Sequence, residues 1–242
     1  MKLLTSIFLF TILSTHLFSQ SAINDQPFGG GGGYLAGWMI PDLKPLNTEL
    51  AGFGTPALSE SGFFSSGGGG FLYIGFIPHL RVGGVGFTGS TSGTGLVNGY
   101  EKEVKYSNSM GGLTVEYSLP FIRRFAVSIG FIAGFGSAQI ETYRYKGSQD
   151  WNTVISDLGN PNASVGSYGR TMTNSYFLLA PTLNIDYPFH PLVLLRVGAG
   201  YSFTFGKEWK LDNGQILNNV PESISGKSFF IQVGIMGGLF FL

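Results

Sequence analysis

The sequence predicts an all-β protein, an antiparallel up-and-down transmembrane β-barrel of eight strands behind an N-terminal signal peptide. Several segments alternate large apolar residues with small or polar ones at a period of two, which is the pattern of a strand with two different faces. Only 12% of the 242 residues are charged and 38 are glycine, which is too little charge for a water-facing sheet surface. After Leu13 no apolar run is long enough for a helix to span a membrane, so a membrane-crossing chain must use closed strands.

The first 20 residues have the layout of a secretory signal peptide. Lys2 precedes an apolar run from Leu3 to Leu13, and the small residues Ser19 and Ser21 follow near the expected cleavage position. The apolar run is shorter than the roughly 20 residues of a membrane-spanning helix, which disfavours the alternative of a retained anchor. We therefore assign residues 1–20 to the signal peptide and 21–242 to the outer-membrane barrel domain.

Alternation is clearest in residues 124–136, where most odd positions are large and apolar and most even positions are small or polar. The same parity recurs in residues 175–187, 193–205 and 229–241. We predict that the odd positions face lipid and the even positions face the lumen. A soluble barrel or sandwich with its apolar face inward is the alternative, but its outer face would carry more charge.

Short and long connections alternate along the chain. Tight proline-bearing turns are expected at residues 77–81, 119–123 and 187–191, and longer polar stretches at 41–66, 92–98, 146–170 and 207–226. Short periplasmic turns and longer extracellular loops are typical of outer-membrane barrels, so both termini are predicted to be periplasmic.

Eight strands follow from these connections. A ten-strand count, which separates residues 57–66 from the strand after them, is the alternative. Pro181 removes a ladder donor in mid-strand and is predicted to mark a β-bulge. The predicted strands cover residues 31–40, 66–77, 80–91, 100–119, 122–143, 171–187, 192–206 and 227–242.

The stretch after the first strand is expected to include a short helix. Leu43, Leu46 and Leu50 recur at helical spacing, and Gly52 or Gly54 would end the helix. It could lie over the outer mouth as a lid, but a plain surface loop is the favoured interpretation.

Residues for catalysis, metal binding or cofactor binding are scarce, and we predict a protein without enzymatic activity or cofactor. The chain has no cysteine, and His79 and His190 fall in predicted periplasmic turns. The glycine runs at 29–33 and 67–70 lack the Lys-Ser/Thr that a phosphate-binding loop needs. The formal net charge is zero, which gives no reason to expect a nucleic-acid partner.

Four charged residues share the even, lumen-facing parity near the inner ends of their strands: Glu116, Arg124, Asp186 and Arg196. Because buried charges persist when they are paired, we predict a lumen network of these acids and guanidinium groups at the periplasmic end. A structural plug is the favoured role, because side chains just fill an eight-stranded interior, and a proton or ion path is the alternative.

The alternating strands, the proline turns and the final Gly237 to Leu242 resemble the small outer-membrane β-barrel proteins, the class that includes the barrel of outer membrane protein A. The resemblance implies an integral location in outer-membrane lipid and recognition by the barrel-assembly machinery. That class usually ends in an aromatic residue, whereas here Leu242 follows Phe241.

Three functions fit this fold. A structural or surface-interaction role through the extracellular loops, especially 146–170 and 207–226, is favoured, because function on a common scaffold lies in its loops. The extracellular ligand or partner is not identified by the sequence. A narrow pore, or a carrier for a small hydrophobic molecule, is the main alternative, and an enzyme at the lipid interface is the third.

Overall fold

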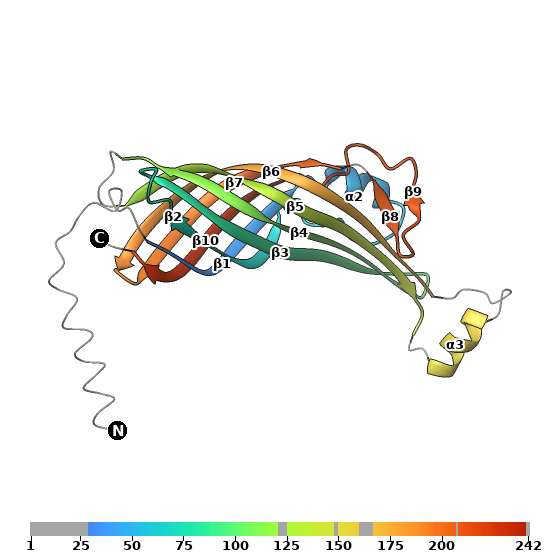
Figure 1. Ribbon diagram of the computed structural model, residues 1–242. Helices are drawn as coiled ribbons and strands as arrows, with labels where there is room; N and C mark the ends of the chain where they lie inside the picture. Colours follow the sequence, from blue (N-terminus) through green and yellow to red (C-terminus); the bar gives the residue numbers. More distant parts are fainter. Residues whose placement is uncertain (1–28, 121–124, 148–149, 160–166, 207, 241–242) are drawn as a thin grey trace, which may run out of the picture.

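Eight long strands form a closed antiparallel barrel in the computed structural model (Figure 1), which describes residues 29–120, 125–147, 150–159, 167–206 and 208–240. Consecutive barrel strands are neighbours, and pairing of β1 with β10 and of β5 with β6 completes the closed wall. The prediction of an eight-stranded up-and-down barrel is confirmed. The strands are β1 (Gly30–Pro41), β2 (Phe63–Tyr73), β3 (Leu80–Val97), β4 (Tyr100–Ser118), β5 (Ala126–Tyr145), β6 (Tyr168–His190), β7 (Val193–Phe205) and β10 (Ser228–Leu239).

The strands are tilted, as closure of a sheet into a barrel requires. The register can be followed from Phe177 on β6 to Phe135 on β5 and on through every strand of the wall. It returns to β6 at Tyr187, far down the same strand. A row of paired residues therefore runs at an angle to the rim of the barrel.

The predicted faces are confirmed on β5. Ile129 is 55% exposed and points outward, whereas its neighbour Ser128 is fully buried in the lumen. Odd residues also face outward on β6, β7 and β10. On β1 to β3 the parity is reversed, and Leu35, Phe71 and Phe87 face inward.

Glycine allows the wall to curve tightly on the side of β1 to β5. A Cβ added at Gly83 or Gly112 would overlap the backbone carbonyl of a paired strand. Both positions face inward, so the absent side chain is what permits the close approach. This packing accounts for part of the glycine excess seen in the sequence.

The predicted loop at residues 92–98 is wrong. β3 continues to Val97 and β4 begins at Tyr100, so a two-residue turn joins them. Asn98 and Gly99 have φ of 52° and 78°, the left-handed conformation that a tight hairpin of this kind requires. The polar composition of 92–98 is that of a strand outside the membrane, and β3, β4, β5 and β6 continue together beyond the rest of the barrel (Figure 1). We call this part, residues 90–108, 137–145 and 168–175, the extension.

Two further expectations need correction. The register between β6 and β7 is unchanged on the two sides of Pro181, and the irregularity lies between Pro188 and His190 instead. The two additional strands are not split from residues 57–66. They are β8 (Trp209–Leu211) and β9 (Ile216–Leu217), a short hairpin that pairs with β6 above the barrel.

Two short helices, α2 (Lys44–Leu50) and α3 (Trp151–Gly159), lie at the end of the molecule that carries the extension (Figure 1). Leu43 and Leu46 are almost fully buried and pack with Leu58 in the hydrophobic core. The predicted helix is confirmed, and the burial of Leu43 and Leu46 shows that this segment packs on the hydrophobic core and is not a plain surface loop. Within the residues that the structure describes, no helix is long and apolar enough to cross a membrane.

Candidate functional site

Two guanidinium groups and two carboxylates meet in the lumen, toward the end of the barrel where β1 begins and β10 ends. Arg196 on β7 donates to both carboxylate oxygens of Asp186 at 2.7 and 2.8 Å and to both of Glu116 at 3.0 Å. Arg81 on β3 donates to Asp186 Oδ2 at 2.6 Å and to Glu116 Oε2 at 2.8 Å. All four side chains are buried, and their charges balance. We call these residues the ion cluster.

Neighbouring side chains make further hydrogen bonds and ring contacts with the ion cluster. Ser128 Oγ lies 2.5 Å from Arg81 Nη2, and Asn184 Nδ2 donates to Glu116 Oε1 at 3.1 Å. The ring of Phe71 faces both guanidinium groups, with centroid distances of 4.3 Å to Arg81 and 4.8 Å to Arg196. The cluster thus joins β2 to β7 across the lumen. Buried charges are retained in this way only when each has several partners.

Three of the four predicted network residues come together here, and the fourth, Arg124, lies outside the described residues. Sequence reasoning missed Arg81, because glycines on β3 hide its parity. The position of Arg81 could have been found from Asn98 and Gly99, which are typical of a tight hairpin turn. A two-residue turn at these positions fixes the hairpin register and places Arg81 directly opposite Glu116.

The lumen has almost no free space above the ion cluster. A cavity lined by Leu35, Ile132, Glu116 and Arg196 measures about 10 Å³, which is room for about one water molecule. Apolar side chains, including Leu178 and Phe230, fill the lumen further out. Over the residues that the structure describes, the interior is filled mainly by packed side chains.

A second polar contact lies toward the end of the barrel that carries the extension. The Tyr176 hydroxyl donates to Asn108 Oδ1 at 2.5 Å, and Asn108 Nδ2 donates to the carbonyl oxygen of Gly226 at 3.3 Å. The Tyr176 ring also lies against Gly136 and Gly226, where an added Cβ would overlap it. This contact fastens the 208–226 segment to the barrel wall.

Changing Tyr176 to phenylalanine is expected to lower the free energy of unfolding by about 1 to 3 kcal/mol, because a buried amide oxygen loses its donor. Urea titration of the protein refolded in lipid bilayers measures the change, and hydrogen exchange should become faster in residues 208–226. Tyr187→Phe, on the lipid-facing side, is the control and should have little effect. Unchanged exchange in residues 208–226 would show that the contact does not fasten them.

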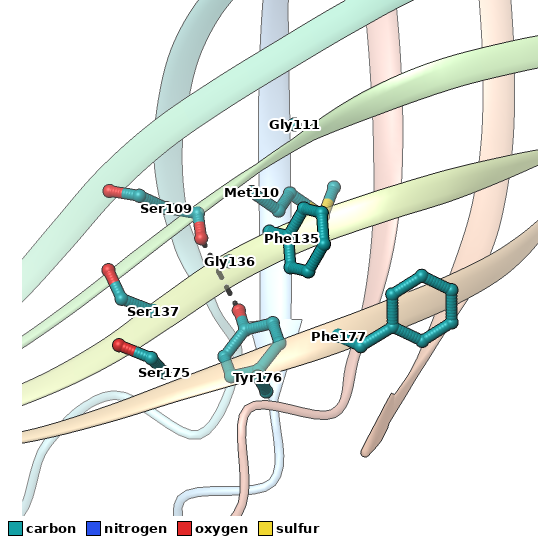
Figure 2. Close-up of a pocket in the computed structure, with 9 residues that line it drawn as sticks. All are labelled: Ser109, Met110, Gly111, Phe135, Gly136, Ser137, Ser175, Tyr176 and Phe177. Atoms are coloured by element: carbon teal, nitrogen blue, oxygen red, sulfur yellow. Dashed lines mark hydrogen bonds between the residues drawn. The ribbon is translucent and has the colours of Figure 1, made fainter. Parts of the chain in front are cut away.

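The outward side chains of the barrel wall change from apolar to polar next to a row of aromatic residues. Phe135, Phe177 and Phe205 form a cross-strand row, with ring centroids 5.7 and 6.3 Å apart. Figure 2 shows Ser109, Ser137 and Ser175 on adjacent strands beside a hollow of about 560 Å³ that Phe135 and Phe177 also line. Aromatic girdles of this kind flank the apolar band of transmembrane barrels, so we place the outer boundary of the band here.

Beyond this boundary the outward side chains are mainly polar. Lys105 and Glu141 pair at 3.1 Å, and the Tyr143 hydroxyl donates to Glu141 Oε2 at 2.7 Å. The bond from Tyr143, together with Lys105, holds the pKa of the Glu141 carboxyl below its ordinary value. This surface is suited to water rather than to lipid.

Within the part of the chain that the structure describes, no group of three or more His, Cys, Asp or Glu side chains could hold a metal ion. His79 lies in the turn between β2 and β3 and His190 at the inner end of β6, both at the rim opposite the extension.

A closed eight-stranded barrel with an apolar outer wall and a side-chain-filled lumen defines a small transmembrane β-barrel protein of the outer-membrane type. No protein-family model matches this chain, and no curated protein matches it in sequence.

Solved structures of outer-membrane proteins are similar in fold. A major outer membrane protein from Thermus thermophilus is 10% identical with a TM-score of 0.46, covering 87% of this chain and 99% of that one. The attachment invasion locus protein Ail of Yersinia pestis, in complex with the heparin analogue sucrose octasulfate, is 13% identical with a TM-score of 0.38, covering 88% and 99%. The outer membrane protease OmpT of Escherichia coli is 10% identical with a TM-score of 0.35, covering 93% and 99%. The assignment of the fold rests on the strand pairing described above.

Proposed function

We propose that the mature chain is an integral outer-membrane protein that acts in surface interaction through its extracellular part, without enzymatic activity and without forming a pore. The observation that carries this proposal is the contrast between the two ends of the barrel. The lumen is filled by the ion cluster and by apolar side chains, whereas four strands continue well past the aromatic row of Phe135, Phe177 and Phe205.

The proposed orientation places both termini in the periplasm. Gly30 pairs with Leu239, so the described ends of the first and last barrel strands lie at the same rim. The extension and α2 lie at the other rim, where long external segments are expected. Residues 1–20 belong to this proposal as a cleaved signal peptide. Outer-membrane lipid and the barrel-assembly machinery belong to it as partners.

Conductance in planar bilayers tests the absence of a pore. The refolded protein is expected to give no steady, reproducible current steps, because the described lumen has room for about one water molecule beside the ion cluster. Regular steps of one size would contradict the proposal and favour the narrow-pore alternative.

A single cysteine at Asn213 is expected to react with a membrane-impermeant thiol reagent on intact cells, whereas a cysteine at His79 should react only after the outer membrane is opened. Asn213 lies in the turn between β8 and β9, and His79 lies in the turn between β2 and β3 at the opposite rim. The chain has no native cysteine, so the background should be low. Labelling with the reverse preference would invert the proposed topology.

A further inference from the structure

The outward side chains directly beyond the aromatic row are uncharged. On β3 to β6 the first row past it is formed by Thr88, Ser109, Ser137 and Ser175. The second row is formed by Ser90, Ser107, Gln139 and Thr173. The first charged side chains, Lys105 and Glu141, stand in the third row and pair with each other at 3.1 Å. We call the first two rows the neutral rows.

A hollow of about 560 Å³ lies where the first neutral row meets the aromatic row. Figure 2 shows the three serines of that row on one side of the hollow and the rings of Phe135 and Phe177 on the other. Gly111, the ladder partner of Phe135, has no side chain to fill the space beside the ring, and the Phe135 side chain is 74% exposed. The hollow therefore offers an apolar ring next to a line of hydroxyl groups.

Two of the serine hydroxyls in the hollow have no partner in the protein. Within the residues that the structure describes, the hydroxyls of Ser137 and Ser175 make no hydrogen bond, whereas the Ser109 hydroxyl lies 2.8 Å from Thr88 Oγ1. A serine hydroxyl can donate one hydrogen bond and accept two. Neighbouring strands are about 4.8 Å apart, so the two free hydroxyls are spaced to bind two polar groups of one small molecule. A ligand can use them without breaking a contact of the fold.

The position of the hollow limits the chemistry of its occupant. Aromatic girdles lie where the hydrocarbon of a membrane meets its headgroups, so the neutral rows lie at the level of the headgroups. Lys and Arg side chains attract anionic headgroups, and the neutral rows on β3 to β6 contain neither. Free hydroxyls beside an exposed ring match a sugar instead, because a sugar has hydroxyl groups around its edge and an apolar face of C–H groups.

We propose that the hollow binds the neutral sugar headgroup of a glycolipid in the membrane leaflet on the side of the extension. The sugar packs against the Phe135 ring and forms hydrogen bonds with Ser137 and Ser175. Ser137 lies about 7 Å beyond Phe135 on the same face, so one sugar can reach both. The acyl chains lie along the apolar wall on the other side of the aromatic row, where Leu113 and Leu179 are exposed. This inference goes beyond the proposed function and needs only that the aromatic row lies at a membrane boundary.

The experiment uses native mass spectrometry of the full mature chain released from nanodiscs, and it counts the lipids that the protein retains. The nanodiscs contain phosphatidylcholine with equal amounts of diglucosyl diacylglycerol and phosphatidylglycerol of the same acyl chains. Wild-type protein is expected to retain the diglucosyl lipid in preference to phosphatidylglycerol. Ser137→Ala/Ser175→Ala should lower this preference at least roughly fivefold, because two hydrogen bonds to the sugar are lost. The control Ser90→Ala/Ser92→Ala, on the outward face of β3 outside the hollow, should leave it nearly unchanged.

A second pair of variants tests the ring. Phe135→Ala removes a ring that lines the hollow, whereas Phe205→Ala removes a ring of the same aromatic row outside it. Only Phe135→Ala should lower the retention of the diglucosyl lipid. Urea titration of the two serine double variants should give the same midpoint, which separates lost binding from lost folding.

Several results would overturn the inference. These are equal retention of the two lipids by the wild-type protein, a preference for phosphatidylglycerol, or an equal loss in the hollow variants and their controls. Release of the glycolipid by an equal concentration of the free disaccharide would also overturn it, because the ligand would then be a soluble sugar. The conductance experiment reports on the proposed function independently. Absence of pores without selective retention rejects this inference alone, whereas regular pores with selective retention reject the proposed function alone.

Discussion

Arg196→Met is expected to lower the free energy of unfolding by about 3 to 5 kcal/mol, the largest effect of any substitution considered for this protein. Arg196 contacts both carboxylates of the ion cluster, and its side chain is almost fully buried. Removing it leaves two carboxylates with one guanidinium group, that of Arg81, in a buried site with room for about one water molecule. Urea titration of the refolded protein in bilayers measures the change.

Two companion variants separate charge from shape. Arg196→Lys keeps the positive charge but loses the planar fork of donors, so its loss should be intermediate. Lys210→Met removes a cation whose partner, Glu208, lies 2.9 Å away with both side chains more than half exposed, and it should change stability by less than about 1 kcal/mol. If Arg196→Met fell within the same range as Lys210→Met, the ion cluster would not hold the barrel together.

The second large effect is expected for Ile129→Arg, at about 2 to 4 kcal/mol when the residue lies near the bilayer midplane. Ile129 is on the lipid-facing side of β5, between the inner end of the strand and the aromatic row. An arginine there must leave water and enter hydrocarbon. Refolding in bilayers followed by urea titration gives the cost.

The best control is on the same strand and the same face. Gln139→Arg lies beyond the aromatic row, outside the apolar band, and should be close to neutral. Ser128, the inward residue next to Ile129, is unsuitable as a tolerant control because its hydroxyl is hydrogen-bonded to Arg81 of the ion cluster. Equal losses for Ile129→Arg and Gln139→Arg would mean that the apolar band is placed wrongly.

The architecture could be predicted because each transmembrane strand carries its own signal. Residues 125–131 alternate Phe, Val and Ile with Ala, Ser and Gly, which is the pattern of a strand between lipid on one side and a narrow lumen on the other. The turns could be placed because proline and glycine mark them. Whether a side chain contacts lipid depends on its own position along the strand, so the pattern can be recognised in a single sequence.

The outer end was harder to predict because its determinants are not local. Residues 90–94 are Ser, Thr, Ser, Gly and Thr because they lie in water, and composition alone cannot distinguish such a strand from a loop. Leu43 and Leu46 belong to a hydrophobic cluster that also contains Trp209, which is distant in sequence. Arg81 was missed because the glycines at 83, 84 and 86 give no alternation that shows which side chains face the lumen. The register fixed by the turn at 98–99 would have placed it opposite Glu116.

The tight turn at Asn98 and Gly99 also bears on the entropy of binding. A flexible loop loses about 1 to 2 kcal/mol for each backbone residue that a ligand immobilises. Here the backbones of Lys102 and Arg144 are already fixed by ladder hydrogen bonds before any ligand arrives. Most of that ordering cost has been met during folding, so any partner that meets the extension finds strands that are already ordered instead of a loop that it must order.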